Sequence, residues 1–276
     1  MPFPNIDPIA FSIGPLAIRW YALAYLAGIA FAFFYGRLLI KQKPLWHKST
    51  PPMTATQLTD FVFWAIIGVI VGGRLAYVVF YSMLVGGDYY FTNPLAIFAV
   101  WEGGMSFHGG LIGVALAAVF FARHIKQNPL SALDLMAAIA PIGLLLGRVA
   151  NFINGELYGR VTTMPWGVVF PEGGPDPRHP SQLYEGLLEG LICFIILRIA
   201  THNLTALRKP GLVAGLFAVI YAASRILVEF VREPDAHIGL LPYGLTMGMA
   251  LSIPVGLIGI ALMINAARTK KGGRAI

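Results

Sequence analysis

The stretch WEGGMSFHGGLIGVALAAVFFARH, residues 101–124, changes character at its middle. Its first half places two glycine pairs around a short segment that contains His108, as an active-site loop of a soluble protein would. Its second half is an apolar run of the kind that forms a helix in lipid. Irregular backbone at membrane depth is tolerated only against protein or a water-filled cavity. The stretch therefore indicates a membrane helix whose beginning does not face lipid.

The rest of the chain repeats the apolar pattern. Seven long apolar segments can be recognised, at residues 11–36, 58–82, 95–122, 131–153, 183–200, 211–231 and 243–267. A spanning helix needs about 20 mostly apolar residues, and all but the fifth segment reach that length. Only 12% of the 276 residues are charged and the mean hydropathy is +0.71, whereas soluble proteins carry about 25% charged residues. We therefore expect an all-α membrane protein, a single integral domain over residues 1–276 that forms a polytopic bundle of about seven transmembrane helices.

Basic residues between the segments predict the orientation. Thirteen of the 20 Lys and Arg residues follow the first, third, fifth and seventh segments: Arg37, Lys41, Lys43, Lys48, Arg123, Lys126, Arg198, Arg208, Lys209, Arg268, Lys270, Lys271 and Arg274. The connections on the other side hold Arg160, Arg178 and Arg232. Because cytoplasmic loops are rich in Lys and Arg, we expect a periplasmic N-terminus, a cytoplasmic C-terminus and a periplasmic segment around residues 157–182. This topology accounts for the net charge of +7, so the charge indicates no nucleic-acid partner.

Four further arginines lie inside apolar segments: Arg19, Arg74, Arg148 and Arg225. Following each segment in its expected direction places all four in the outer half of the membrane. A charge at the centre of a membrane helix costs at least ~2.5–3.5 kcal/mol, so four arginines on one side favour an anion-binding site for lipid phosphate. The alternative is that each arginine snorkels or pairs with a buried carboxylate. Four glutamates are available for such pairs: Glu156, Glu185, Glu189 and Glu229.

Two polar sets accompany these arginines. In the sixth segment the helical period places four polar residues on one face: Tyr221, Arg225, Glu229 and Arg232. The fourth segment ends in GRVANFINGELYGR, whose polar side chains include Arg148, Asn151, Asn154 and Glu156. Polar groups on apolar helices turn toward the bundle interior or a wet cavity, so we expect both sets to line the anion site. For Asn154, which begins an Asn-Gly pair, a plain helix stop is an equally good interpretation.

Two more candidates come from the second segment and from the opening stretch. In GGRLAYVVFY we expect Arg74 and Tyr81 to contact a substrate, although Tyr81 is equally well interpreted as an interfacial tyrosine. An unperturbed histidine titrates near pH ~6.5, so a residue such as His108 can serve as a general base or donate a hydrogen bond to phosphate. A purely structural histidine is the alternative.

These motifs together resemble the bacterial phosphatidylglycerol–prolipoprotein diacylglyceryl transferases. The resemblance covers almost the whole chain, through IRWYALAYLAG, GGRLAYVVFY, GGMSFHGGLIG, GRVANFINGELYGR, RHPSQLYEGLLEG and YAASRILVEFVREPD. It implies transfer of the diacylglyceryl group of phosphatidylglycerol to the lipobox cysteine thiol of a prolipoprotein. A thioether forms and glycerol phosphate leaves, the first step of lipoprotein maturation. It also implies a multi-pass enzyme of the bacterial cytoplasmic (inner) membrane, active at the periplasmic side, whose partners are phosphatidylglycerol, the prolipoprotein signal peptide and membrane lipid.

The resemblance also implies roles for the candidate residues. Arg148 and Arg225 would grip the phosphate, Tyr221 would join them in the catalytic set, and His108 would be a base or an orienting donor. The expected substrate contacts are Tyr21, Arg74, Tyr81, Asn151, Asn154, Glu156, Glu229 and Arg232. The family needs no cofactor. No metal is expected either, since HExxH is absent and the single cysteine, Cys193, cannot build a cysteine-based metal site.

Two positions depart from the family pattern. Ala22 stands where glycine is usual, and Met249 stands where glutamine often follows Met247-Gly248. For this reason we leave residues 247–249 out of the expected site. The main rival function is a lipid or anion transporter, which an inverted repeat with paired broken helices would favour. No convincing internal repeat is recognisable in the sequence.

Overall fold

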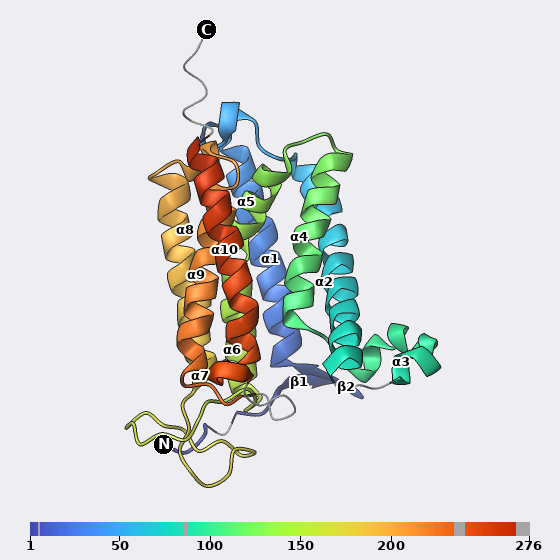
Figure 1. Ribbon diagram of the computed structural model, residues 1–276, viewed down its shortest axis with the longest axis vertical. Coiled ribbons are helices and arrows are strands. Elements are labelled where there is room, and N and C mark those ends of the chain that lie inside the picture. Colours follow the sequence, from blue (N-terminus) through green and yellow to red (C-terminus); the bar gives the residue numbers. More distant parts are fainter. Residues whose placement is uncertain (5, 85–87, 235–240, 269–276) are drawn as a thin grey trace.

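A computed structural model describes the chain except for residues 5, 85–87, 235–240 and 269–276, and it leaves out the side chains of residues 80–84, 102 and 107. Long helices run side by side along one axis (Figure 1). The first half of the chain forms β1 (Ile9–Ile13), β2 (Leu16–Arg19), α1 (Trp20–Lys41), η1 (Lys43–Leu45), η2 (His47–Ser49), α2 (Ala55–Leu84), α3 (Tyr89–Thr92), η3 (Pro94–Phe98), η4 (Val100–Glu102), α4 (Phe107–His124) and α5 (Pro129–Ile139). The second half forms α6 (Pro141–Ile153), α7 (Ser181–Glu185), the π-helix η5 (Gly186–Ile192), α8 (Cys193–His202), η6 (Ala206–Arg208), α9 (Leu212–Glu229), η7 (Pro242–Gly244) and α10 (Met247–Arg268).

Each of the seven expected apolar segments contains helix, but two of them begin differently. The first segment starts as an antiparallel hairpin of β1 and β2, because Gly14 adopts a positive φ of 58° and the chain reverses there. Arg19, expected inside a membrane helix, is therefore the exposed last residue of β2. In the third segment the chain forms the short helices η3 and η4, and α4 begins only at Phe107, after Ser106 accepts the N–H of Gly109 at 3.2 Å.

One further segment is a bent pair of helices, and another is a continuous helix that changes type along its length. The fourth segment bends by 40° between α5 and α6, where Pro141 lacks the N–H that would continue the helix. The fifth runs through α7, η5 and α8 without a gap. Within the described residues, four helices are long and apolar enough to cross a membrane, or five if the bent pair is one span. The structure is thus that of a mostly helical, multi-span membrane protein, and about seven spans stays a prediction.

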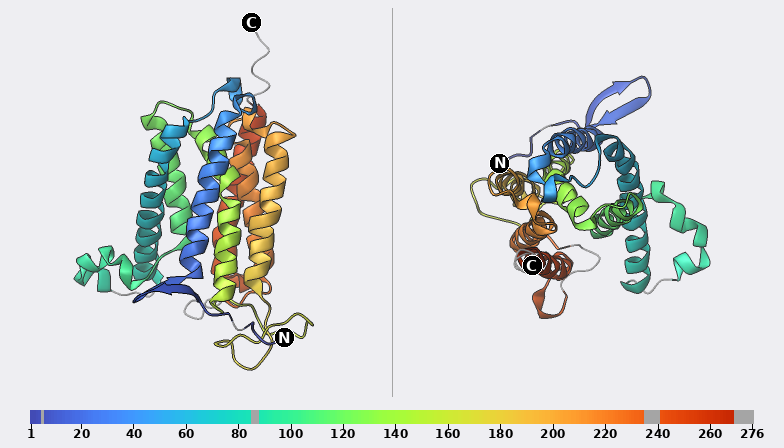
Figure 2. Two further views of the ribbon diagram at one scale, coloured as in Figure 1. Left: turned by 180° about the vertical axis from the view of Figure 1, so that it is seen from behind. Right: turned by 90° about the horizontal axis from the view of Figure 1, so that it is seen from above.

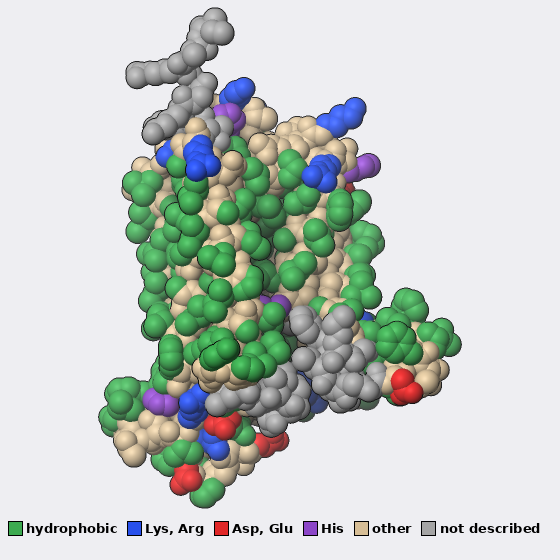
Figure 3. All heavy atoms as spheres, in the orientation of Figure 1, with side chains coloured by type: hydrophobic (Ala, Val, Ile, Leu, Met, Phe, Trp, Pro, Cys, Tyr) green, Lys and Arg blue, Asp and Glu red, His purple; other side chains and the backbone are tan. Residues whose placement is uncertain are grey.

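The two ends of the bundle differ in structure. At one end, which we call the basic end, η1 and η2 pack on η6: Arg208 Nε donates to the carbonyl of Pro44 at 3.0 Å, and His47 Nδ1 bonds to the carbonyl of Arg208 at 2.9 Å. The other end, the hairpin end, carries β1–β2, α3 and residues 154–180, and the hairpin and α3 project sideways from it (Figure 2). On the face drawn in Figure 3, apolar side chains cover the helices between the two ends. Which end faces the cytoplasm stays a prediction.

The expected segment around residues 157–182 lies at the hairpin end. Residues 157–180 contain no helix, and the last two residues of the segment begin α7. Isolated bridges hold it together, such as those of Val161 and Val168 with Arg178. Another bridge joins Gly159 to Arg232, just after α9. This segment is therefore fixed to the end of α9, where the polar stripe of that helix lies.

Candidate active site

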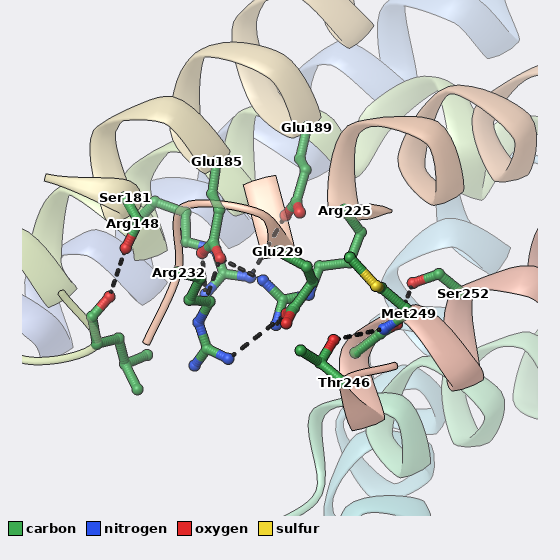
Figure 4. Close-up of polar contacts among 12 residues, drawn as sticks. Arg148, Ser181, Glu185, Glu189, Arg225, Glu229, Arg232, Thr246, Met249 and Ser252 are labelled. Carbon is green, nitrogen blue, oxygen red and sulfur yellow. Dashed lines mark hydrogen bonds and ion pairs between the residues drawn. The ribbon is translucent and has the colours of Figure 1, made fainter. Parts of the chain in front are cut away.

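Three arginines, two buried and one partly buried, meet three buried glutamates at the hairpin end of the bundle (Figure 4). We call this set the ion-pair cluster, and its members are Arg148, Glu185, Glu189, Arg225, Glu229 and Arg232. They come from the end of α6, from α7 and η5, and from the end of α9 and the residues after it. No side chain in the set is more than 14% exposed. The formal charges of the six residues cancel.

Glu185 occupies the centre of the cluster. Its Oε2 lies 2.8 Å from Arg148 Nη1, and its Oε1 pairs with Arg225 Nη1. Arg232 Nε lies 3.5 Å from the same Oε1. A carboxylate that is fully buried must be paired or change its protonation state, and here three guanidinium groups surround it. Glu185 therefore connects α6 to α9 and to the chain after α9.

The stripe on α9 lies on one buried face, as its spacing predicted. Tyr221 and Glu229 are each 1% exposed, and Arg225 Nη2 pairs with Glu229 Oε1. Arg232 Nη1 lies 3.6 Å from that oxygen. Arginine has five N–H donors, and the ion pairs of Arg225 within the described chain engage Nη1 and Nη2. The carboxylates thus hold this guanidinium in place without using all of its donors.

Glycines allow α7 and η5 to press against α6. A Cβ on Gly190 would lie 2.8 Å from the Cα of Leu145, and one on Gly186 would lie 3.3 Å from the Cβ of Arg148. The close approach brings Glu189 Oε2 to 3.3 Å from Arg148 Nη2. Single π-helical turns inside helices are frequent at functional sites, and this one immediately follows Glu185.

The two interpretations of the membrane arginines can now be compared. Arg148 and Arg225 make the carboxylate pairs of the alternative interpretation, with Glu185, Glu189 and Glu229 as partners. A guanidinium group has five N–H donors, so pairing with a carboxylate is compatible with binding an anion. The expected grip by these two arginines stays a prediction.

The structure does not bring Arg74 to the cluster. Its guanidinium donates to four backbone carbonyls: those of Ala96 at 2.6 Å, Ile97 at 2.9 Å, Gly103 at 2.7 Å and Gly104 at 3.1 Å. These bonds attach η3 and the Gly103-Gly104 turn to α2, and the expected contact of Arg74 with a substrate stays a prediction. The side chain of Tyr81 lies outside the described residues.

The end of α6 carries a second polar group, one turn beyond Arg148. Asn151 Nδ2 donates to Glu156 Oε1 at 2.7 Å, and Asn154 Nδ2 lies 3.5 Å from the same oxygen. Asn154 is also the residue at which α6 ends, and Gly155 follows with a φ of 69°. The helix-stop interpretation of Asn154 therefore fits the structure, while its side chain still faces Glu156.

Two further candidates lie in the first turns of other helices. His108 is in the first turn of α4, half-buried, and within electrostatic range of Arg225 and Arg148. Tyr21 is in the first turn of α1, where its hydroxyl accepts a hydrogen bond from Tyr25 at 3.3 Å. Helices α1, α4, α6 and α9 thus each direct at least one expected site residue to the hairpin end.

Comparison of the sequence with known proteins identifies the family of this chain. The sequence profile of the prolipoprotein diacylglyceryl transferase family matches residues 8–265. A phosphatidylglycerol–prolipoprotein diacylglyceryl transferase of Agrobacterium fabrum is 53% identical over 272 residues, 98% of this chain and 96% of the relative. Proteins of the same name from Brucella anthropi and Rhizobium meliloti are 54% and 52% identical, over 97% and 96% of this chain and 94% of each relative.

The chain belongs to the prolipoprotein diacylglyceryl transferase family. The matched range contains the entire ion-pair cluster, His108 and the polar end of α6. Within the described residues of this family member, no group of three His, Cys, Asp or Glu side chains is placed to hold a metal ion.

Sequence reasoning missed the contacts of three residues at the ion-pair cluster. Glu185 and Glu189 were considered only as partners for arginines, yet they hold Arg148 in the cluster. Their four-residue spacing, with a glycine after each, was the available signal. Gly248 was left out with the departure at Met249, although a Cβ at Gly248 would lie 2.2 Å from Glu229 Oε1. Nothing in the sequence indicates that contact, because it joins α9 to α10 through the fold.

Proposed function

We propose that this chain transfers the diacylglyceryl group of phosphatidylglycerol to the lipobox cysteine thiol of prolipoproteins, and that the ion-pair cluster receives the lipid phosphate. The cysteine sulfur forms a bond to the glyceryl carbon as the bond from that carbon to the phosphate oxygen breaks. The products are a thioether and glycerol phosphate. Membership of the transferase family supports the reaction, and the gathering of three arginines at one end of an apolar bundle is the observation that supports the site.

The arginines of the cluster can stabilise the charge that develops on the leaving phosphate. The leaving phosphate gains charge as the carbon–oxygen bond breaks, and donors fixed before the reaction stabilise such charge most effectively. Glu185 and Glu229 fix Arg225 on two sides, so the guanidinium need not reorganise when the phosphate arrives. Arg148 is held in the same way by Glu185 and Glu189. The planar fork of arginine also matches two phosphate oxygens at once.

The other expected substrate contacts lie around the two arginines. Asn151, Asn154 and Glu156 offer amide and carboxylate groups for the lipid headgroup, and Tyr21 and Tyr221 line the same end of the bundle. The hairpin end then faces the periplasm and the outer leaflet of the inner membrane, where the signal peptide presents its cysteine. The basic end faces the cytoplasm, with the Lys and Arg residues that the positive-inside rule places there.

The thiol needs activation. A free cysteine has a pKa near ~8.5 and is mostly protonated at neutral pH. His108 can remove the proton, or it can donate a hydrogen bond that orients the substrate while the nearby arginines favour the thiolate. Both roles place its ring near the reacting sulfur.

Mass spectrometry of a lipobox peptide tests the proposal. Purified protein in detergent is incubated with the peptide and phosphatidylglycerol, with wild type, Arg225→Ala, Arg225→Lys and Arg123→Ala compared. Arg123 is an exposed arginine near the end of α4 at the basic end, so its loss is the matched control. We expect wild type and Arg123→Ala to form the adduct, and both Arg225 variants to lose ~10²–10³ in rate. Melting temperatures identify any variant that fails to fold.

The same assay separates the two roles of His108. Glutamine keeps an N–H donor but cannot accept the thiol proton. A loss of ~10²–10⁴ in His108→Gln is expected for a general base, whereas a variant that retains most of its rate identifies an orienting donor. Binding of phosphatidylglycerol by folded wild type without any adduct would refute the transferase and favour lipid transport.

A further inference from the structure

The first turn of α10 packs directly against the ion-pair cluster. In Figure 4, Thr246, Met249 and Ser252 lie on one side of the Arg225–Glu229 pair. Between them, a Cβ added to Gly248 would lie 2.2 Å from Glu229 Oε1 and 3.1 Å from Arg225 Nη2. The first of these distances is far below a van der Waals contact, so only glycine fits unless a neighbour moves.

The backbone of α10 is held in this position. The side chain of Thr246 accepts the N–H of Met249 at 3.2 Å, which caps the helix. Ser252 Oγ donates to the carbonyl of Gly248 at 2.7 Å. Both polar side chains are buried, at 3% and 0% exposure, and their bonds fix the shape of the first turn. The helix as a whole is held by close packing on α9, since a Cβ on Gly259 of α10 would lie 2.8 Å from the carbonyl oxygen of Gly215 on α9. Withdrawing α10 to make room for a methyl at Gly248 would open this contact.

The group that must move is the carboxylate of Glu229. It is 1% exposed, and the oxygen that would meet the methyl is the one that pairs with Arg225 Nη2. The same oxygen lies 3.6 Å from Arg232 Nη1. Displacing it removes one of the two carboxylates that hold Arg225, and the guanidinium loses its fixed orientation.

We infer that Gly248 is a positioning residue of the transfer reaction, acting through Glu229 to orient the Arg225 guanidinium toward the lipid phosphate. The inference rests on the proposed function. Orientation matters most when the phosphate gains charge, so a misaligned Arg225 weakens stabilisation of the transition state more than binding of the ground state. The signature is a fall in kcat with little change in KM.

Gly248→Ala tests this inference, and Gly256→Ala, the same substitution on the same helix, is the control. A Cβ on Gly256 would lie 3.2 Å from the Cβ of Ala222, away from the cluster. With the lipobox peptide and phosphatidylglycerol, we expect kcat of Gly248→Ala to fall by ~10-fold or more, a fraction of the ~10²–10³ for loss of a whole donor. Because 3.2 Å is itself a tight contact, Gly256→Ala controls for crowding between α10 and α9, and its kcat should stay near wild type. Alanine favours a helix over glycine, so weakened helix formation cannot explain the loss. Equal kcat for the two variants would overturn the inference.

A double-mutant cycle with Glu229→Asp separates positioning from a general packing defect. Aspartate withdraws the carboxylate by one methylene and leaves room for the methyl. In the Glu229→Asp background we therefore expect Gly248→Ala to cause no further fall in kcat or in melting temperature. Losses that simply add would show that the two residues act independently, which contradicts the inference. Inactive wild type would refute the proposed function, and the melting-temperature cycle would still decide whether Gly248 makes room for Glu229.

Discussion

Glu185 is fully buried and faces three arginines from three parts of the chain. Taking such charges out of water is expensive, and their mutual attraction compensates only when the pairing is complete. The cluster meets this condition by matching three guanidinium groups with three carboxylates. Charge balance at the level of single residues is thus a condition for burying three arginines at this end of the bundle.

Removing the charge of Glu185 should therefore strongly destabilise the fold. In Glu185→Gln the carboxylate is lost but the volume is kept, and the arginines are left underpaired. Breaking a buried pair in this way costs about 3–5 kcal/mol, so we expect a marked fall in melting temperature in detergent. Glu233→Gln is the control, because Glu233 is 49% exposed in its pair with Arg178 at 2.9 Å, and surface pairs contribute about 0–1 kcal/mol. Similar melting temperatures for the two variants would mean that the central ion pairs do not stabilise the fold.

At the scale of the helices, close backbone contacts hold neighbouring helices of the bundle together. A Cβ on Gly113 of α4 would lie 1.9 Å from the carbonyl oxygen of Gly68 on α2, and one on Gly259 of α10 would lie 2.8 Å from that of Gly215 on α9. Apolar lipid provides no hydrophobic drive for association, so membrane helices depend on close packing, and small residues allow their backbones to approach this closely. The α2–α4 contact also fixes the start of α4, where His108 lies.

The α2–α4 contact predicts opposite effects of two neighbouring substitutions. Gly113→Ala must push α2 and α4 apart, and overpacking of this kind costs about 1–3 kcal/mol. Gly110→Ala meets its nearest neighbour, Val69, at 3.5 Å, an ordinary contact, so it should be neutral or slightly stabilising. Thermal unfolding in detergent measures both. If Gly110→Ala proved as harmful as Gly113→Ala, the close approach of the two helices would not be the cause.

The sequence predicted some elements closely and others only in part. Residues 211–231 match α9 within two residues, because a polar stripe with helical spacing runs through an apolar segment. The hairpin before α1 was missed because its residues are as apolar as the helix that follows, and total hydropathy does not distinguish a strand from a helix. At the site, Arg225 and Glu229 follow from spacing within one helix. Glu185 and Gly248 do not, because their partners lie on other helices.

At the scale of the whole molecule, the bundle separates two kinds of polar structure. The ion-pair cluster and the α6 amides lie at the hairpin end, while the η1, η2 and η6 contacts lie at the basic end (Figure 1). The alternation of basic loops in the sequence predicted this separation. Its direction relative to the membrane depends on the positive-inside rule alone.

Cysteine labelling tests that direction. In a Cys193→Ala background, single cysteines replace two exposed residues: Glu172 at the hairpin end and Asn203 at the basic end. We expect a membrane-impermeant maleimide to label Glu172→Cys in intact spheroplasts, and Asn203→Cys only after permeabilisation, because lysine-rich and arginine-rich loops stay in the cytoplasm. The reverse pattern would place the cluster on the cytoplasmic side and contradict the proposed site of action.

The mass of the product formed by wild type tests the central claim most directly. Phosphatidylglycerol with two isotopically labelled acyl chains is incubated with the purified protein and a lipobox peptide, and both products are measured. The account predicts a peptide that carries both labelled chains on its cysteine through a thioether, together with one glycerol phosphate for each modified peptide. A peptide that carries a single acyl chain, or a modified peptide without glycerol phosphate release, would contradict the account.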